Sequence, residues 1–141
     1  MGEGKLIRSH RELNVWRRAF DASMEIFGHS RSFPREETYS LTDQIRRSSR
    51  SVTTNITEAW RKRRYEAAFV AKLNDAEAEA AETQDWLEYA VKCGYLERPA
   101  ARTLYAAYEA ILKTLVGMIT HADTWVLPVS PAAARRARRG P

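Results

Sequence analysis

Arginines and hydroxyl side chains recur along one face of a helix predicted between residues 40 and 62. Residues three and four apart lie on the same side of a helix, so this spacing gathers guanidinium and hydroxyl groups on one surface. The members of the set are Arg46, Arg50, Thr53, Thr54, Thr57, Arg61 and Arg64. Arginine offers paired N–H donors that fit phosphate, and threonine can add a hydroxyl contact. The face therefore predicts binding to a phosphate backbone, with arginines displacing counterions and little reading of base edges.

The charge around this face is segregated along the chain. Residues 41–64 hold seven cations and two acids, a net charge of +5, whereas residues 67–91 hold six acids and one lysine, a net charge of −5. The predicted nucleic-acid-binding cations of the basic stretch are Arg46, Arg47, Arg50, Arg61, Lys62, Arg63 and Arg64. The alternative is that the basic and acidic stretches pair with each other, within or between subunits, and fix the register of an assembly. Both interpretations stay open at this point.

A second basic cluster lies at the end of the chain. Four of the five net positive charges belong to arginines in the last seven residues: Arg135, Arg136, Arg138 and Arg139. Residues 128–141 contain too little apolar surface for packing, so we expect a disordered basic tail. Such a tail adds phosphate affinity without specificity, or serves only solubility. Residues 1–8 are expected to be a flexible leader, and residues 9–127 a single helical domain.

Hydrophobic periodicity predicts four helices. Ser9 and Glu12 form a capping-box pattern, from which the first helix is expected to run to Phe27 and stop at Gly28. Its main apolar stripe is predicted to be Leu13, Trp16, Phe20 and Phe27, with Val15, Ala19, Ala22 and Ile26 beside it. A loop with one helical turn at its end should follow. The second helix is expected to begin near Ser40, with Asp43 in the capping-box position, and to end near Lys62.

The third and fourth helices have regular core stripes. An a/d repeat over three heptads comprises Phe69, Leu73, Ala76, Ala80, Thr83, Leu87 and Ala90. The corner before it is predicted at 61–64, where four adjacent cations repel one another within a helix. Gly94 should end the third helix, Pro99 should open the fourth, and the fourth should fade near His121. The core stripe of the fourth helix is predicted to be Leu104, Tyr108, Ile111, Leu115 and Met118. The predicted fold class is all-α, an antiparallel up-down four-helix bundle.

Three residues of the second helix carry alternative interpretations. Asn55 and Glu58 are predicted to satisfy buried hydrogen bonds between helices and so to fix the bundle register, in preference to contacting a ligand. Trp60 is predicted to be a core or interface anchor, with base stacking beside the cationic corner as the alternative.

Other function classes find little support in the sequence. The three histidines are scattered, and no Gly-rich phosphate loop or Cys-x-x-Cys occurs, so we expect neither catalytic residues nor a metal or cofactor. No stretch is apolar enough for a membrane span, the start has no signal-peptide pattern, and there is one cysteine, Cys93. A cytoplasmic protein without membrane contact is the default expectation.

Motifs in residues 11–120 resemble the four-helix bundle family associated with 23S rRNA intervening sequences, which includes accessory proteins of diversity-generating retroelements. The resemblance depends on Leu13-x-x-Trp16, on Phe33-Pro34 through Arg46-Arg47, on Ser51-Val52-x-x-Asn55-Ile56-x-Glu58, and on Glu82-Thr83 and Gly94-Tyr95-Leu96. It implies a homopentameric barrel and, for some members, binding of nucleic acid or of a reverse transcriptase. No enzymatic activity is established for that family.

The chain departs from the family pattern after Glu58, where members usually carry glycines and this sequence reads Ala59-Trp60-Arg61-Lys62-Arg63-Arg64. The corner must form without glycine, and it is more cationic. The sequence therefore predicts a non-enzymatic homo-oligomer, a pentamer by resemblance, that binds nucleic acid and favours RNA over DNA. The alternative is a scaffold that docks another protein, such as a reverse transcriptase, without touching nucleic acid.

Overall fold

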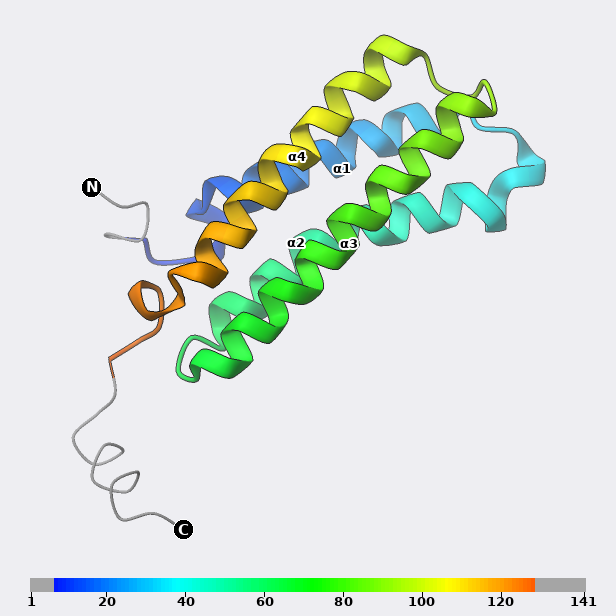
Figure 1. Cartoon of the computed structure of the whole chain (residues 1–141). Coiled ribbons are helices and arrows are strands. Elements are labelled where there is room, and N and C mark those ends of the chain that lie inside the picture. The colour runs from blue at the N-terminus through cyan, green and yellow to red at the C-terminus, as the bar shows by residue number, and fades with distance from the viewer. Residues whose placement is uncertain (1–6, 129–141) are drawn as a thin grey trace.

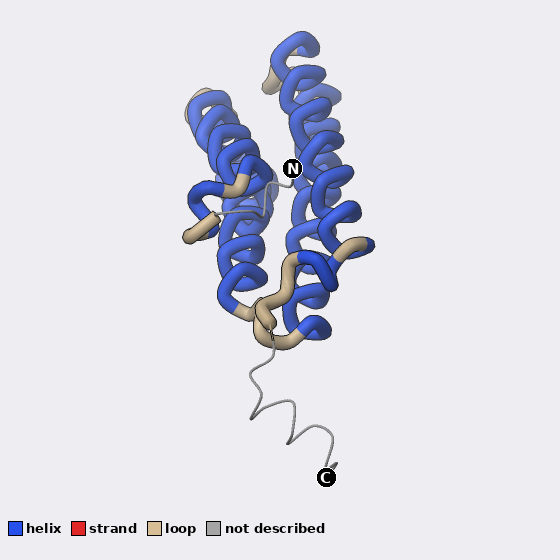
Figure 2. The backbone as a smooth tube through the Cα atoms, turned by 90° about the vertical axis from the view of Figure 1, so that its left-hand side faces the viewer, coloured by secondary structure: helices blue, strands red, loops and turns tan. Residues whose placement is uncertain are grey.

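Four long helices make up most of the computed structural model, which describes residues 7–128 (Figure 1). The helices are α1 (Asn14–Ser30), α2 (Asp43–Arg61), α3 (Glu66–Lys92) and α4 (Arg98–Thr120). Figure 2 shows helices joined by short loops, and no strand occurs within residues 7–128. The all-α class with four helices is therefore confirmed. Most of the predicted leader and nearly all of the predicted basic tail, including Arg135, Arg136, Arg138 and Arg139, lie outside the described residues.

One apolar core lies among the four helices. α2 packs against both α1 and α3, α3 packs against α4, and α4 packs against α1. Every member of the predicted a/d repeat of α3 is buried, which confirms that stripe. The predicted stripe of α4 is confirmed in the same way: Leu104, Tyr108, Ile111, Leu115 and Met118. Each large side chain buried in this way contributes roughly 1.5–3 kcal/mol relative to an exposed one.

α1 uses a different core stripe from the one expected as its main one. Its buried apolar residues are Val15, Ala19, Ala22 and Ile26. Phe20 is exposed, and Trp16 and Phe27 are half-buried at the edge of the core. Alanines let the α1 backbone approach its neighbours closely, so the smaller stripe faces the core and the larger aromatic one is displaced to its flank.

The two ends of α1 also differ from expectation. The capping box between Ser9 and Glu12 forms, but it caps a 3₁₀ turn, η1 (His10–Glu12), and extended Leu13 separates that turn from α1. Gly28 is not the stop, because α1 continues to Ser30. The buried Ser30 hydroxyl donates to the Phe27 carbonyl at 3.0 Å and accepts from Arg46. Tertiary contacts of this kind hold one more half-turn than glycine propensity suggests.

The capping predicted for the start of α2 is wrong. A 3₁₀ turn, η2 (Arg35–Glu37), runs into a π-helical turn, η3 (Thr38–Thr42), which leads directly into α2. The chain is therefore already helical at Ser40, whose hydroxyl donates to the Glu37 carboxylate at 2.7 Å rather than pairing with Asp43. The expected helical turn at the end of the preceding loop is confirmed by η2.

The remaining boundaries follow the sequence signals. The α2–α3 corner lies at residues 62–65, one residue later than the predicted 61–64, because Arg61 is still in the last turn of α2. Gly94 has φ of 80°, a left-handed conformation that favours glycine, and ends α3. Pro99 lies in the first turn of α4. After the short turn η4 (Ala122–Thr124), Trp125 and Val126 pack against the core.

Candidate nucleic-acid interface

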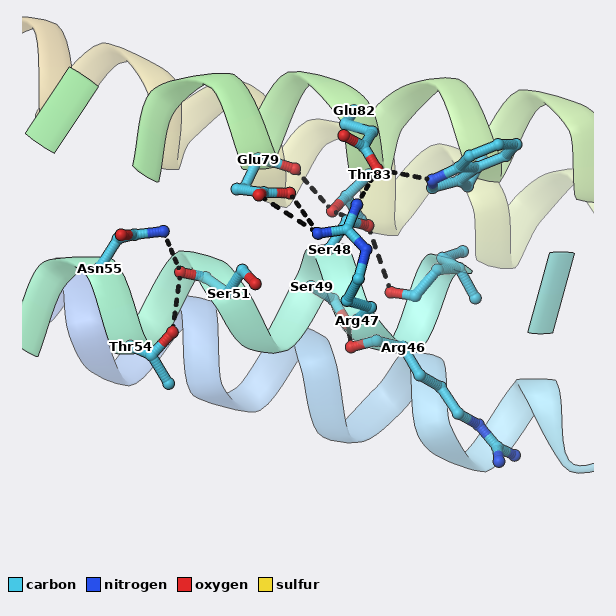
Figure 3. A network of polar contacts seen from close by, with 12 residues as sticks. Arg46, Arg47, Ser48, Ser49, Ser51, Thr54, Asn55, Glu79, Glu82 and Thr83 are labelled. Atoms are coloured by element: carbon cyan, nitrogen blue, oxygen red, sulfur yellow. Dashed lines mark hydrogen bonds and ion pairs between the residues drawn. The ribbon is translucent and has the colours of Figure 1, made fainter. Parts of the chain in front are cut away.

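The adjacent residues Arg46 and Arg47 point to opposite sides of α2. Figure 3 shows Arg47 turned toward α3, among carboxylates, and Arg46 turned away from α3 toward α1. Consecutive side chains of a helix project about 100° apart, so neighbours in sequence can face different helices. We refer to the two sides of α2 as its α3 flank and its α1 flank.

On the α3 flank, the cations are paired with acids. Arg47 donates to Glu79 at 3.3 Å and also to Glu82, and Lys72 lies 2.8 Å from Glu58. Partial burial lowers the pKa of Arg47, but the hydrogen bonds and charges of Glu79 and Glu82 outweigh it and raise the pKa overall. The predicted phosphate contact at Arg47 therefore competes with two carboxylates of its own chain. This part of the surface matches the alternative in which basic and acidic helices pair.

A buried hydroxyl pair lies beneath these ion pairs. Thr83 of α3 donates to Ser48 of α2 at 2.8 Å, and both residues are fully buried. This bond joins the two helices where their backbones come together. It has the role in helix register that was predicted for Asn55 and Glu58.

Asn55 and Glu58 do not make the buried bonds expected of them. The Asn55 amide donates to the Ser51 carbonyl of its own helix at 2.9 Å. Glu58 does link α2 to α3, through Lys72, but its side chain is half exposed. The hydrogen bond from Lys72 is the main cause that lowers the pKa of Glu58. An exposed pair of this kind contributes little to stability because water screens it.

The α1 flank has a different composition, because its arginines lie over aromatic rings. Arg46 donates from Nε to the Ser30 hydroxyl at 2.8 Å, and its guanidinium lies 4.8 Å from the centre of the Phe27 ring. The guanidinium of Arg50 lies 5.9 Å from the same ring. Cation–π contacts orient a guanidinium without neutralising its charge. Neither arginine forms an ion pair with a carboxylate among residues 7–128.

The aromatic contacts continue toward the N-terminal end of α1. The Trp16 indole donates to Thr57 of α2 at 3.2 Å and stacks on Phe20 with ring centres 5.1 Å apart. Arg11 lies 5.7 Å from the Trp16 ring. We call this surface the aromatic–arginine face and define it by seven residues: Arg11, Trp16, Phe20, Phe27, Arg46, Arg50 and Arg61.

His10 reports on the charge at this end of the face. Its ring makes an edge contact with Trp16 at 5.4 Å. Burial, followed by the charges of Arg11 and Arg61, lowers the pKa of His10 below its ordinary value. The part of this shift that comes from Arg11 and Arg61 indicates that both arginines add positive potential around the His10 ring.

The predicted hydroxyl contribution to the face is mostly absent. Thr53 is buried, and its hydroxyl donates to the Arg50 carbonyl at 2.8 Å. Thr54 is exposed but donates to the Ser51 carbonyl, and Thr57 donates to the Thr53 carbonyl while accepting from Trp16. Threonine hydroxyls inside helices commonly bond back to carbonyls, which leaves the guanidiniums as the main donors of this surface.

At the corner, three of the four cations face solvent: Arg61, Lys62 and Arg64. Arg63 instead lies 3.4 Å from the centre of the Trp60 ring and donates to the Trp60 carbonyl at 2.9 Å. Burial and the charge of Arg61 lower the pKa of Arg63. Trp60 is only 4% exposed, so it is an anchor and the base-stacking alternative for it is wrong. The arginine bond to the last turn helps close α2 without glycine.

The end of the described chain returns to this corner. The Leu127 amide donates to the Arg63 carbonyl at 2.9 Å, so the last described residues lie next to the exposed cations of the corner. Trp125 and Val126 pack against the core, so the chain after α4 turns back onto the bundle.

The described residues bear on the predictions about metal binding, the cysteine and membrane contact. Within residues 7–128, no group of three or more histidine, cysteine, aspartate or glutamate side chains could hold a metal ion. Cys93 is exposed. None of the helices in the described range is both long and apolar enough to cross a lipid bilayer.

The sequence interpretation missed the aromatic half of the face. Trp16, Phe20 and Phe27 were assigned to the main core stripe of α1, where large aromatics usually belong. One signal was available: the helix has two adjacent apolar stripes, and the one of alanine and β-branched residues packs more closely. When the apolar surface of a helix is wider than its contact with the core, part of that surface lies outside the core.

The sequence and the fold of this chain are both similar to those of known proteins. Residues 11–117 match the family described as 23S rRNA-intervening sequence protein. The crystal structure of a protein of unknown function from the S23 ribosomal protein family of Bacteroides thetaiotaomicron is similar to this chain, with a TM-score of 0.67 and 29% sequence identity. The match covers 74% of this chain and 97% of that one. No curated protein matches the chain. The four helices and the matched residues together show that this chain belongs to the 23S rRNA-intervening sequence protein family.

Proposed function

We propose that this protein is a non-enzymatic, oligomeric helical bundle that binds nucleic acid, RNA in preference to DNA, through the α1 flank of α2 and the following corner. One observation carries the proposal. Arg50, Arg61 and Arg64 are exposed, and none of them forms an ion pair with a carboxylate within residues 7–128, whereas nearby Arg47 is paired twice. The preference for RNA comes from the family name alone.

The physical argument is electrostatic. A guanidinium without a carboxylate partner can contact phosphate without first breaking an ion pair, and each contact releases counterions from the nucleic acid. A shallow depression on α2, lined by Arg46, Arg47, Arg50, Ser51 and Thr54, contains one acid, Asp43. Affinity without base reading is the expected behaviour.

Oligomerisation is part of the proposal. We take the antiparallel up-down bundle as the subunit and a ring of five copies as the assembly, as the family resemblance implies. Exposed apolar side chains such as Met24 (52% exposed) and Val116 (46% exposed) support contacts between copies. A ring would repeat the basic surface and strengthen a modest site by avidity. A cytoplasmic location fits this function.

The test is anisotropy binding to a structured RNA and a matched DNA duplex at about 50 and 200 mM salt. The variant is Arg50→Gln/Arg61→Gln/Arg64→Gln. The matched control is Arg98→Gln/Arg102→Gln/Lys113→Gln, which removes the same charge from exposed positions of α4. We expect the wild type to bind with a steep salt dependence. In the first variant the slope of log K against log [salt] should become shallower by up to about 2.7, and in the control it should change little.

Two results would contradict the proposal. Absence of wild-type binding at low salt would exclude nucleic-acid binding by this chain. An equal loss in both triple variants would show that net charge, and not the face, determines affinity. A truncation before Arg135 separates the tail from the bundle: if truncation alone abolishes binding, the site does not lie on α2.

A groove between α3 and α4 favours a second candidate, the protein scaffold. It has a volume of about 820 Å³ and is lined by apolar residues that include Leu87, Val91, Ala101 and Tyr105, with charged residues at its margins. Such a groove fits an amphipathic helix of another protein. This function predicts a partner complex that resists salt and that changes with Tyr105→Glu but not with the arginine variant.

A further inference from the structure

Phe20 is the most exposed ring of the aromatic–arginine face and lies between Trp16 and Phe27 along α1. It is 43% exposed although it stacks on Trp16, with the two ring planes only 18° apart. Exposing a phenylalanine forgoes part of the roughly 1.5–3 kcal/mol that full burial contributes. The corner tryptophan, in contrast, is buried and covered by Arg63. Within residues 7–128, α1 therefore carries a pair of stacked rings beside an arginine that forms no ion pair with a carboxylate.

The aromatic rings of this face are held in place by their neighbours. Trp16 is fixed from below by its hydrogen bond to Thr57 and from the side by His10. Phe27 lies under the guanidiniums of Arg46 and Arg50. A ring that is already oriented loses little conformational freedom when a ligand stacks on it.

We propose that the aromatic–arginine face binds unpaired nucleotides, with a base stacked against Phe20 and the adjoining phosphates on Arg11, Arg46, Arg50 and Arg61. This inference rests on the proposed function and narrows its ligand to single-stranded segments of RNA or DNA. Proteins that bind single strands combine cations along the backbone path with aromatic side chains that receive bases. A duplex keeps its bases stacked internally and offers this face only phosphates.

The charge of the aromatic–arginine face favours a nucleotide over an apolar protein surface as its ligand. Covering the aromatic–arginine face with apolar side chains would desolvate its guanidiniums, which have no carboxylate partner within residues 7–128. A nucleotide brings a flat apolar ring and an anion together in one unit. It therefore satisfies both halves of the face.

The experiment compares two single strands of about 12 nucleotides, one of oligo(U) and one of the same length and backbone without bases. Both carry the same phosphates, so their difference isolates stacking. Phe20→Leu removes the aromatic ring and keeps an apolar side chain. The matched control is Tyr89→Leu on α3, which removes an exposed ring that also contacts a tryptophan, Trp86, at 5.7 Å.

We expect the wild type and Tyr89→Leu to bind oligo(U) about tenfold more tightly than the abasic strand. In Phe20→Leu the two affinities should agree within about twofold, with the salt dependence unchanged. The mass of the assembled oligomer and the melting temperature are measured for each variant, and both should stay close to the wild-type values.

The outcomes distinguish the two levels of the proposal. Equal wild-type binding of both strands overturns base stacking and leaves electrostatic binding intact. Failure to bind either strand, with binding of a duplex, also overturns the inference. Failure to bind any nucleic acid overturns the proposed function as well. A reduced oligomer mass in Phe20→Leu would assign the face to contacts between copies and overturn the inference.

Discussion

The two flanks of α2 are built from the same helix and the same type of cation, yet they differ in what is left for a partner. On the α3 flank, Arg47 is held by Glu79 and Glu82, above the buried pair of Ser48 and Thr83. On the α1 flank, Arg46 and Arg50 lie over the Phe27 ring, which orients them and leaves their charge unneutralised.

The difference shows that a run of arginines in a sequence is not yet a binding site. The neighbouring helix decides which guanidiniums are consumed by internal ion pairs and which remain available. α3 is acidic and neutralises the side of α2 that it touches. α1 contributes aromatic rings to the other side, and rings do not compete with phosphate.

The largest effect is expected from the buried pair on the α3 flank. Thr83→Val keeps the shape of the side chain and removes the donor to Ser48, which should lower the free energy of unfolding by about 1–3 kcal/mol in urea denaturation. Nucleic-acid binding should stay unchanged at concentrations where the variant is folded. A change in affinity without a change in stability would contradict the structural role of this flank.

Tyr108→Phe is a control for this argument, and we expect it to raise the free energy of unfolding. The Tyr108 hydroxyl is buried without a hydrogen-bond partner in the described structure, and burial is the main cause that raises its pKa. Removing an unsatisfied hydroxyl should stabilise the protein by roughly 1 kcal/mol in the same measurement.

The two flanks should also separate in binding. Arg50→Gln removes an unpaired cation and is expected to weaken nucleic-acid affinity about fivefold at low salt. Arg47→Gln removes a cation that two carboxylates already neutralise, and should change affinity by less than about twofold. Equal losses in anisotropy titrations would show that the internal ion pairs on the α3 flank do not reduce the availability of Arg47.

A charge-conserving change tests the geometry of the α1 flank. Arg46→Lys keeps the charge but loses the planar contact with Phe27 and the Nε bond to Ser30, so stability should fall by about 0.5–1 kcal/mol. Affinity for nucleic acid should hold, since the charge stays. A loss of affinity larger than the loss of stability would indicate that phosphate is read by paired guanidinium donors.

The smallest effect concerns pH. Burial, with the charges of Arg11 and Arg61, lowers the pKa of His10 from 6.5, so the folded protein binds this proton less well than the unfolded chain does. Stability is therefore highest above pH 6.5 and falls as the pH drops through that value toward the folded-state pKa. NMR titration should show a raised pKa in Arg61→Gln and in the nucleic-acid complex. An unchanged His10 pKa in both would exclude phosphate from this end of the face.

The fold was largely predictable because its signals are local and repeated. The heptads of α3, the glycine with positive φ after it and the proline in the first turn of α4 each specify an element through neighbours in sequence. The end of α1 was not predictable in this way, because Ser30 is held by Arg46, sixteen residues away.

The sequence predicted which cations lie at the site, but not which of them would pair with carboxylates. Arg46, Arg47 and Arg50 were identified together as one set, and the structure divides them between two neighbours. Trp60 was the candidate for stacking and proved to be buried, while Phe20 was assigned to the core and proved to be exposed. Helical periodicity identifies the apolar and the charged stripes of a helix. It does not show which of two similar apolar stripes packs against the core.

By itself, the sequence determined the helix count, the corner after α2 to within one residue, the core stripes of α3 and α4, and the separation of basic from acidic helices. Those properties follow from composition and from periodicity along one chain segment. The tertiary structure alone decided that Arg47 is neutralised, that Arg50 is not, and that aromatic rings accompany the free arginines. The reason is physical: whether a charge is available depends on which groups lie within a few ångströms, and those groups come from other helices.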